Sequence, residues 1–152
     1  MRRAFIAVSS LTVCGVVLLD LWTKARWFSD TSPTFFLLRG LIQSVQHKNE
    51  GLIANLPVPQ GLIIGGTSLL LGFLLVYWWK HRSSNDWLMH LGVACLLGGA
   101  IGNLYDRVLF GYVRDWILLF GRSAMNIADV AIVVGILTLL VQSESYGKKP
   151  PA

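Results

Sequence analysis

Four long apolar segments constrain this chain more than any other feature of its 152 residues. They cover residues 4–22, 61–79, 87–104 and 125–141, and each is 17 to 19 residues long. An α-helix rises about 1.5 Å per residue, so about 20 apolar residues cross the roughly 30 Å of hydrocarbon in a bilayer. Only 14% of the residues are charged, against about 25% in soluble domains. The sequence therefore predicts one integral membrane domain, an all-α bundle of four transmembrane helices.

The connection between the first two segments is too long for a simple turn. Within it, residues 34–38 and 41–45 are apolar or β-prone and are separated by Arg39-Gly40, while Pro57 and Pro59 interrupt regular structure before the second segment. We predict a small extramembrane β-rich cradle after the first helix, at about residues 28–58. The polar residues 80–86, in contrast, predict a tight turn between the second and third helices.

The positive charge does not indicate nucleic-acid binding. The formal net charge is +5, but the thirteen Lys and Arg residues are scattered between the apolar segments and form no basic stripe. With both termini inside, six of them lie on the inner side and seven on the outer side, so the positive-inside rule does not decide the orientation. We expect both termini on the cytoplasmic side.

Four aspartates lie within the apolar segments or at their ends: Asp20, Asp106, Asp115 and Asp129. An Asp at the centre of a membrane helix costs about 2.5–3.5 kcal/mol, so each needs a partner or a chemical task. Asp115 is expected in the loop after the third helix and Asp129 about one turn inside the fourth, on the same membrane face. Two neighbouring carboxylates share one proton, so that one acts as base and the other as acid. We hypothesise that this pair activates water.

Each of these residues also has a purely structural interpretation. Asn126 and Asp129 are spaced i, i+3, so Asn126 can cap a helix whose first turn carries Asp129. Asp20 and Lys24, spaced i, i+4, suit a salt bridge at the membrane interface. Other polar residues are expected to brace the structure. They are Asn103 at the end of the third span with Asp106 and Arg107 in the loop that follows, and Asn49 and Gly51 in a loop that could fold over a site.

Five short motifs occur together in one order, namely Asp20-x-x-Thr23-Lys24, Asn49-x-Gly51, Gly98-Gly99-x-x-Gly102-Asn103-x-x-Asp106-Arg107, Gly111-x-Val113-x-Asp115 and Asn126-x-Ala128-Asp129. In these residues the chain resembles the lipoprotein signal peptidase family, also called signal peptidase II. The resemblance implies an aspartyl endopeptidase of the bacterial cytoplasmic membrane that acts toward the outer face. Its substrates would be diacylglyceryl-modified prolipoproteins, from which it removes the signal peptide.

The same resemblance implies roles for individual residues. Asp115 and Asp129 would be the catalytic dyad, no metal or cofactor would be needed, and the protein would be active as a monomer in contact with membrane lipids. The residues that shape and support the site would be Asp20, Lys24, Asn49, Gly51, Asn103, Asp106, Arg107, Asn126 and Ala128.

The chain departs from the family pattern at several positions. Arg114 stands where family members have an apolar residue, Asn55 where they have an aromatic residue, and Met125 where they have Phe. The stretch between Asp115 and Asp129 is also several residues short. A guanidinium beside Asp115 would be expected to lower the pKa of that carboxyl.

Two other classes of function stay open at this point. Membrane-embedded aspartates also mark ion paths, so a small transporter or a proton-conducting protein is one alternative. Such a protein would need acidic residues distributed through the depth of the bilayer. A non-enzymatic membrane assembly factor with the same fold is the other alternative.

Overall fold

The computed structural model describes residues 2–29, 35–37, 41–51 and 58–147. It contains four long helices, α1 (Arg2–Trp27), α2 (Gln60–His81), α3 (Trp87–Phe110) and α4 (Ile127–Gly147). All four are long and apolar enough to cross a membrane. The predicted bundle of four transmembrane helices is therefore confirmed.

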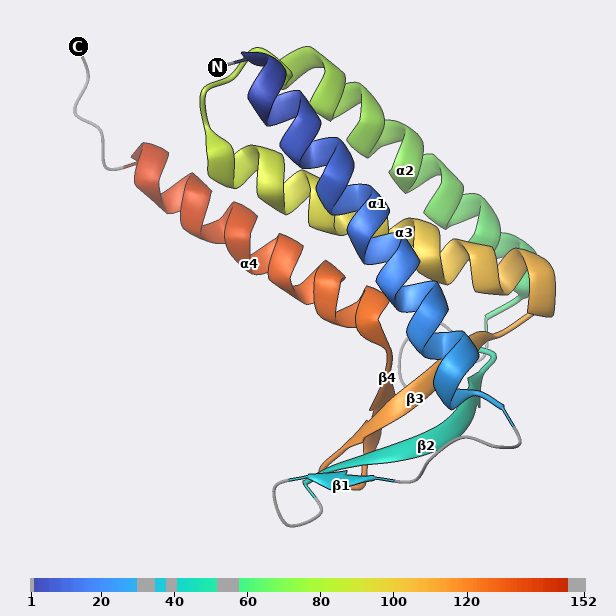
Figure 1. Ribbon diagram of the computed structural model, residues 1–152. Helices are drawn as coiled ribbons and strands as arrows, with labels where there is room; N and C mark the ends of the chain where they lie inside the picture. The colour runs from blue at the N-terminus through green and yellow to red at the C-terminus, as the bar shows by residue number, and fades with distance from the viewer. Residues whose placement is uncertain (1, 30–34, 38–40, 52–57, 148–152) are drawn as a thin grey trace.

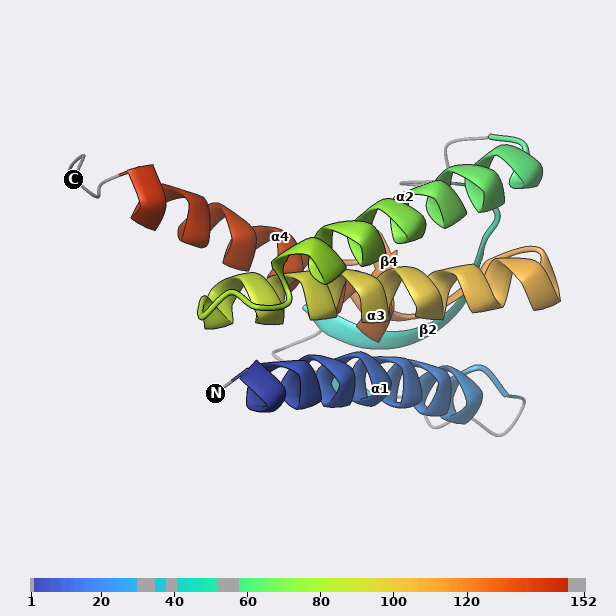
Figure 2. The same cartoon turned by 90° about the horizontal axis from the view of Figure 1, so that it is seen from above.

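Helix α3 forms the centre of the bundle, and the other three helices pack on it (Figures 1 and 2). Of the apolar window of α3, 67% is buried within the protein, against 11% to 17% in the other helices. Small residues allow the close packing: a Cβ added at Gly98 would lie 2.8 Å from the Val16 side chain of α1, and one at Gly99 would collide with the Ala128 carbonyl of α4. Glycines at the end of the third apolar segment thus let α1 and α4 approach α3 closely.

Helix α3 extends further than the sequence predicted. It runs to Phe110 rather than to residue 104, so Asn103, Asp106 and Arg107 lie on the helix, and the expectation that they brace a loop is wrong. Their polar side chains do not end the helix because they are buried and paired inside the protein. Gly111 ends it, with a left-handed φ of 78° and an N–H that donates to the Arg107 carbonyl.

A four-stranded antiparallel sheet caps one end of the bundle (Figure 1). Its strands are β1 (Phe36–Leu37), β2 (Ile42–Asn49), β3 (Val113–Leu119) and β4 (Ser123–Met125), in the order β1-β2-β3-β4. The predicted cradle is confirmed in the connection after α1, but half of the sheet comes from the segment between α3 and α4. Asp115 therefore lies on a strand and not, as predicted, in a loop. Asn55, one of the departures from the family pattern, lies outside the described residues.

The short stretch between Asp115 and Asp129 is a tight hairpin. Strands β3 and β4 are joined by a turn in which the Arg122 N–H donates to the Leu119 carbonyl at 2.9 Å, and Phe120 and Gly121 both have positive φ. Turns of this kind match the twist of paired strands. The hairpin also uses Met125 as its last strand residue, so α4 begins two residues later than predicted.

The sheet and the ends of the chain lie at opposite ends of the bundle. Helix α1 begins and helix α4 ends at the end away from the sheet (Figure 1). The arrangement agrees with termini that share one side of the membrane, while the assignment of that side to the cytoplasm stays a prediction.

Candidate active site

Asp115 is fully buried on β3, and two asparagine amides hold its carboxylate. The Asn49 Nδ2 donates to Oδ2 at 3.1 Å, and the Asn126 Nδ2 donates to Oδ1 at 2.6 Å. Burial raises the pKa of Asp115 to about 6, and the negative charge of Asp129 adds to the shift, whereas the two amides and the charge of Lys24 oppose it. Asp115 is therefore a carboxyl that gains and loses a proton close to neutral pH.

Asn126 links the two aspartates of the predicted dyad. It stands at the start of α4, where its Oδ1 accepts from the Asp129 N–H at 3.0 Å and its own N–H donates to the Asp129 Oδ2 at 3.3 Å. This is a reciprocal capping box, as the i, i+3 spacing predicted. Its remaining group, the Nδ2, reaches Asp115. One residue thus holds Asp115 on a strand and Asp129 on a helix in a fixed relation.

Asn103 holds Asp129 from the side of α3. The Asn103 Nδ2 donates to the Asp129 Oδ1 at 2.7 Å, and the Asn103 Oδ1 accepts from the Lys24 Nζ at 3.1 Å. Because the ammonium of Lys24 only donates, the orientation of the amide follows from the network. Asp129 consequently presents a fixed carboxylate at the end of the bundle.

Lys24 is the centre of a buried ionic cluster. Its Nζ lies 2.7 Å from the Asp20 Oδ2 and 3.2 Å from the Asp106 Oδ2, and all three side chains have 0% exposure. The predicted pair of Asp20 and Lys24 is present, and both side chains are fully buried within the protein. The other oxygen of Asp20 accepts from the Ala128 N–H at 2.9 Å, which ties α1 to the start of α4. A Cβ at Gly102 would lie 2.6 Å from the Asp20 Oδ2, so glycine leaves room for this contact.

Arg114 belongs to this cluster, although the sequence pattern did not place it there. Its Nη2 lies 2.7 Å from the Asp106 Oδ1, and its N–H donates to the Asp106 Oδ2 at 2.9 Å. The guanidinium thus pairs with Asp106, and Arg114 is not among the groups that shift the pKa of Asp115, so the expected lowering by Arg114 is not found. The available signal was an arginine directly before Asp115, in a strand whose other residues are apolar.

Arg107 links the segment between α1 and α2 to the same site. Its Nη2 donates to the Gly51 carbonyl at 3.1 Å, and the Gly51 N–H donates to the Asn49 Oδ1 at 3.1 Å. Asn49 in turn binds Asp115. The eleven residues that the sequence analysis selected therefore form one continuous network of hydrogen bonds and ion pairs. In the described part of the chain, no group of His, Cys, Asp and Glu residues could hold a metal ion.

Fold and site together define a class of protein. It is a multi-pass membrane protein in which two aspartates, held by amides, lie where the helix bundle meets a small sheet. The family model described as signal peptidase (SPase) II matches residues 12–144, and the chain belongs to this family.

Similar proteins support this membership, with matches that cover from 38% to 97% of this chain. A lipoprotein signal peptidase of Dichelobacter nodosus is 50% identical over 62 residues, which cover 38% of this chain and 40% of that protein. A lipoprotein signal peptidase of Halothermothrix orenii is 31% identical over 143 residues, or 90% of this chain and 97% of that protein. A solved bacterial membrane enzyme has the same fold with a TM-score of 0.82 and 26% identity, covering 97% of this chain and 95% of its own.

Proposed function

We propose that this protein is an aspartyl endopeptidase that removes the signal peptide from diacylglyceryl-modified bacterial prolipoproteins. One observation carries the proposal: Asn126 binds the carboxylates of both Asp115 and Asp129, and the pKa of Asp115 is raised to about 6. Membership of the signal peptidase II family and the lipoprotein signal peptidases among its relatives supply the substrate class.

In the proposed mechanism the two carboxyl groups share one proton. The ionised carboxylate takes a proton from a water molecule, whose oxygen attacks the carbonyl carbon of the scissile peptide bond. The protonated carboxyl supports the developing oxyanion and then gives its proton to the leaving nitrogen as the C–N bond breaks. Burial of Asp115 favours its neutral form, so Asp115 is the proposed holder of the proton in the resting pair.

The location of the pair suits a substrate that reaches the site through the bilayer. Asp115 lies on the sheet and Asp129 in the first turn of α4, at the rim of the bundle. Water can enter from the side of the sheet, and a lipid-modified precursor can remain anchored in the adjoining leaflet. In this proposal the sheet end faces outward, and both ends of the chain are cytoplasmic.

The transporter alternative is less well supported. An ion path needs acidic residues at successive depths, but Asp20, Asp106, Asp115 and Asp129 form one group near the sheet. The other acidic residues in the described helices and turns of the bundle, Asp86 and Glu144, lie near the opposite end. A charge-free length of helix therefore separates the two groups.

The test compares wild-type protein with the variants Asp115→Asn and Asp129→Asn on a purified diacylglyceryl-modified precursor. Each variant should lose at least about 1000-fold in kcat, since removal of one member of a catalytic unit abolishes the function of the whole unit. Asp86→Asn, at the far end of the bundle, is the matched control and should cleave normally. Cleavage that survived either dyad substitution would refute the assignment, and aspartate-dependent proton flux in proteoliposomes without cleavage would favour a transporter.

A further inference from the structure

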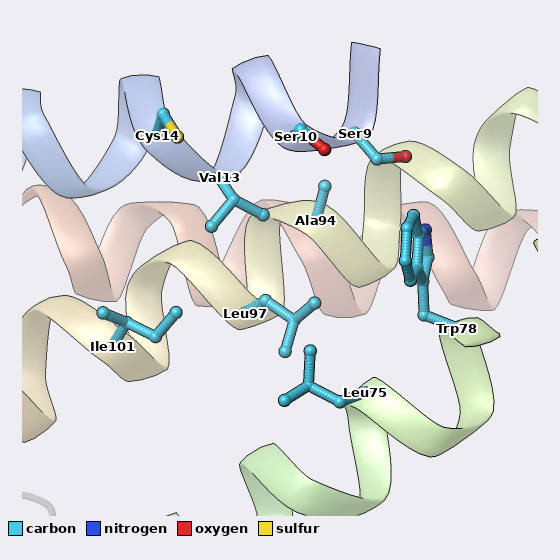
Figure 3. Close-up of a pocket in the computed structure, with 9 residues that line it drawn as sticks. All are labelled: Ser9, Ser10, Val13, Cys14, Leu75, Trp78, Ala94, Leu97 and Ile101. Carbon is cyan, nitrogen blue, oxygen red and sulfur yellow. The ribbon is translucent and has the colours of Figure 1, made fainter. Parts of the chain in front are cut away.

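A second, apolar site lies inside the helix bundle, away from the aspartates. A pocket of about 270 Å³ opens between α1 and α2 above the surface of α3 (Figure 3). This volume is close to the lower end of the range for pockets that hold small ligands, roughly 300–1,000 Å³. Most of its wall is aliphatic and comes from all three helices: Val13, Leu75, Leu97 and Ile101.

Two residues that line the pocket carry buried hydrogen-bond donors without a partner among the described residues. These donors are the Ser9 Oγ of α1, on a residue with 3% exposure, and the Trp78 Nε1 of α2. A serine inside a helix commonly donates its hydroxyl proton to the carbonyl four residues earlier, but Ser9 does not. Buried polar groups are normally satisfied, so two orphan donors in one pocket indicate a missing acceptor.

The two donors mark one end of the pocket. Ser9 and Trp78 lie at the same end, and Ile101 lies at the other (Figure 3). Ser9 is four residues from Phe5, where the apolar part of α1 begins, and Trp78 is three residues from the end of α2 at His81. At a rise of about 1.5 Å per residue both lie roughly 5–6 Å inside the spans, at the end of the bundle away from the sheet.

A glycerophospholipid has both a hydrogen-bond acceptor for the two donors and an apolar chain for the aliphatic wall of the pocket. In spans of 23 and 22 residues, donors this close to the helix ends are expected near the boundary of the roughly 30 Å hydrocarbon layer, where the ester carbonyls of a lipid are acceptors. An acyl chain matches the aliphatic wall beyond them. Lys80 lies in the last turn of α2 and Arg82 directly follows the helix, and the lipid phosphate would lie near these two residues. No charged side chain lines the pocket itself, which argues against an ionic ligand.

We propose that the pocket between α1, α2 and α3 binds one chain of a diacyl glycerophospholipid from the leaflet opposite the sheet. The ester carbonyl accepts hydrogen bonds from the Ser9 hydroxyl and the Trp78 indole N–H, and the acyl chain packs between α1 and α2. None of the pocket residues belongs to the network around Asp115 and Asp129. The inference therefore goes beyond the proposed peptidase activity and can be tested without a cleavage assay.

The test measures lipid binding to the purified full chain in detergent by mass spectrometry under native conditions. A diacyl phosphatidylethanolamine is compared with its dialkyl ether analogue, which has the same chains and headgroup but no carbonyl acceptors. Wild-type protein should bind the diacyl lipid about three- to tenfold more tightly, the value expected for one net hydrogen bond. Equal affinity for the two lipids would overturn the proposal.

Variants assign the preference to the two donors. Ser9→Ala and Trp78→Phe should each reduce the preference for the diacyl lipid, and the double variant should abolish it. Ser143→Ala is the matched control, because that exposed hydroxyl at the same end of the bundle already donates to the Leu140 carbonyl. A preference that persisted in the double variant, or a synthetic signal-peptide helix that displaced the lipid from wild-type protein, would also overturn the proposal.

Discussion

Two pairs of aspartates lie side by side at the sheet end of this bundle, and they differ in what holds them. Asp20 and Asp106 are paired with the cations Lys24 and Arg114. Asp115 and Asp129 accept instead from the amides of three asparagines, Asn49, Asn103 and Asn126, and neither has an ion pair among the described residues. Aspartates at the same end of the bundle therefore lie in two different environments, one with charged partners and one with neutral amide partners.

The difference agrees with a structural role for the first pair and with the chemical role proposed for Asp115 and Asp129. The ion pairs of Asp20 and Asp106 with Lys24 and Arg114 join α1, α3 and β3. A neutral amide compensates burial only in part, so the pKa of Asp115 remains raised and its proton stays exchangeable near neutral pH.

The largest effect on stability is expected from Lys24→Met. The substitution leaves Asp20 buried without its cation, whereas Asp106 keeps Arg114. Breaking a buried ion pair by removing one partner destabilises a protein by about 3–5 kcal/mol. Thermal unfolding of the purified protein should show a large fall in Tm, and Lys80→Met, at the exposed end of α2, should show almost none.

A second substitution sharpens this result. The double variant Lys24→Met, Asp20→Asn should recover part of the lost Tm, because it removes the orphan charge. If Lys24→Met alone had the same Tm as the wild type, the ion pairs of Lys24 with Asp20 and Asp106 would not stabilise the fold.

Asn126→Ala should affect activity and stability together. It removes the amide that holds Asp115 and the cap that holds Asp129. A displacement of about 1 Å in a reacting group can lower a rate by about 100-fold, and the loss of a helix cap costs about 1 kcal/mol. Steady-state cleavage kinetics and thermal unfolding measure the two effects, with Asn85→Ala in the exposed turn before α3 as control. An unchanged kcat would show that Asn126 does not align the pair.

Arg114→Leu should lower stability but leave cleavage within about threefold of wild type. Asp106 loses its charged hydrogen bonds to the guanidinium but keeps Lys24, so the loss should be about 1–3 kcal/mol. Arg122→Leu, on the hairpin turn, is the control for the loss of a positive charge. A large loss of kcat in Arg114→Leu with normal folding would mean that the ionic cluster and the dyad are not separable.

The smallest effect is a shift of the pH profile in Asn49→Leu. The Asn49 amide stabilises the ionised form of Asp115, so its removal raises the pKa of that carboxyl. The alkaline limb of kcat/KM, which reports loss of the shared proton, should move upward by at most about one pH unit. Gln43→Leu, on the same strand, should leave the limb in place. A downward shift would show that the amide favours the neutral form instead.

Most of the candidate site could be predicted from the sequence, because charged residues in an apolar segment are conspicuous and the motifs around them are specific. All eleven selected residues lie in one network. The prediction failed where a residue's environment depended on distant segments. Asp106 and Arg107 continue a helix because their side chains find partners inside the protein, and Asp115 lies on a strand because β2, more than sixty residues earlier, pairs with it.

By itself the sequence determined the four membrane helices and the candidate pair of aspartates, since hydropathy over 20 residues and the cost of a buried charge are local properties. Only the tertiary structure decided which aspartates meet a cation and which meet an amide. Those partners come from α1, α3, α4 and the sheet, and one contact, from the Ala128 N–H to Asp20, joins residues 108 positions apart. Such contacts depend on how the elements pack, and no local pattern in the sequence encodes that packing.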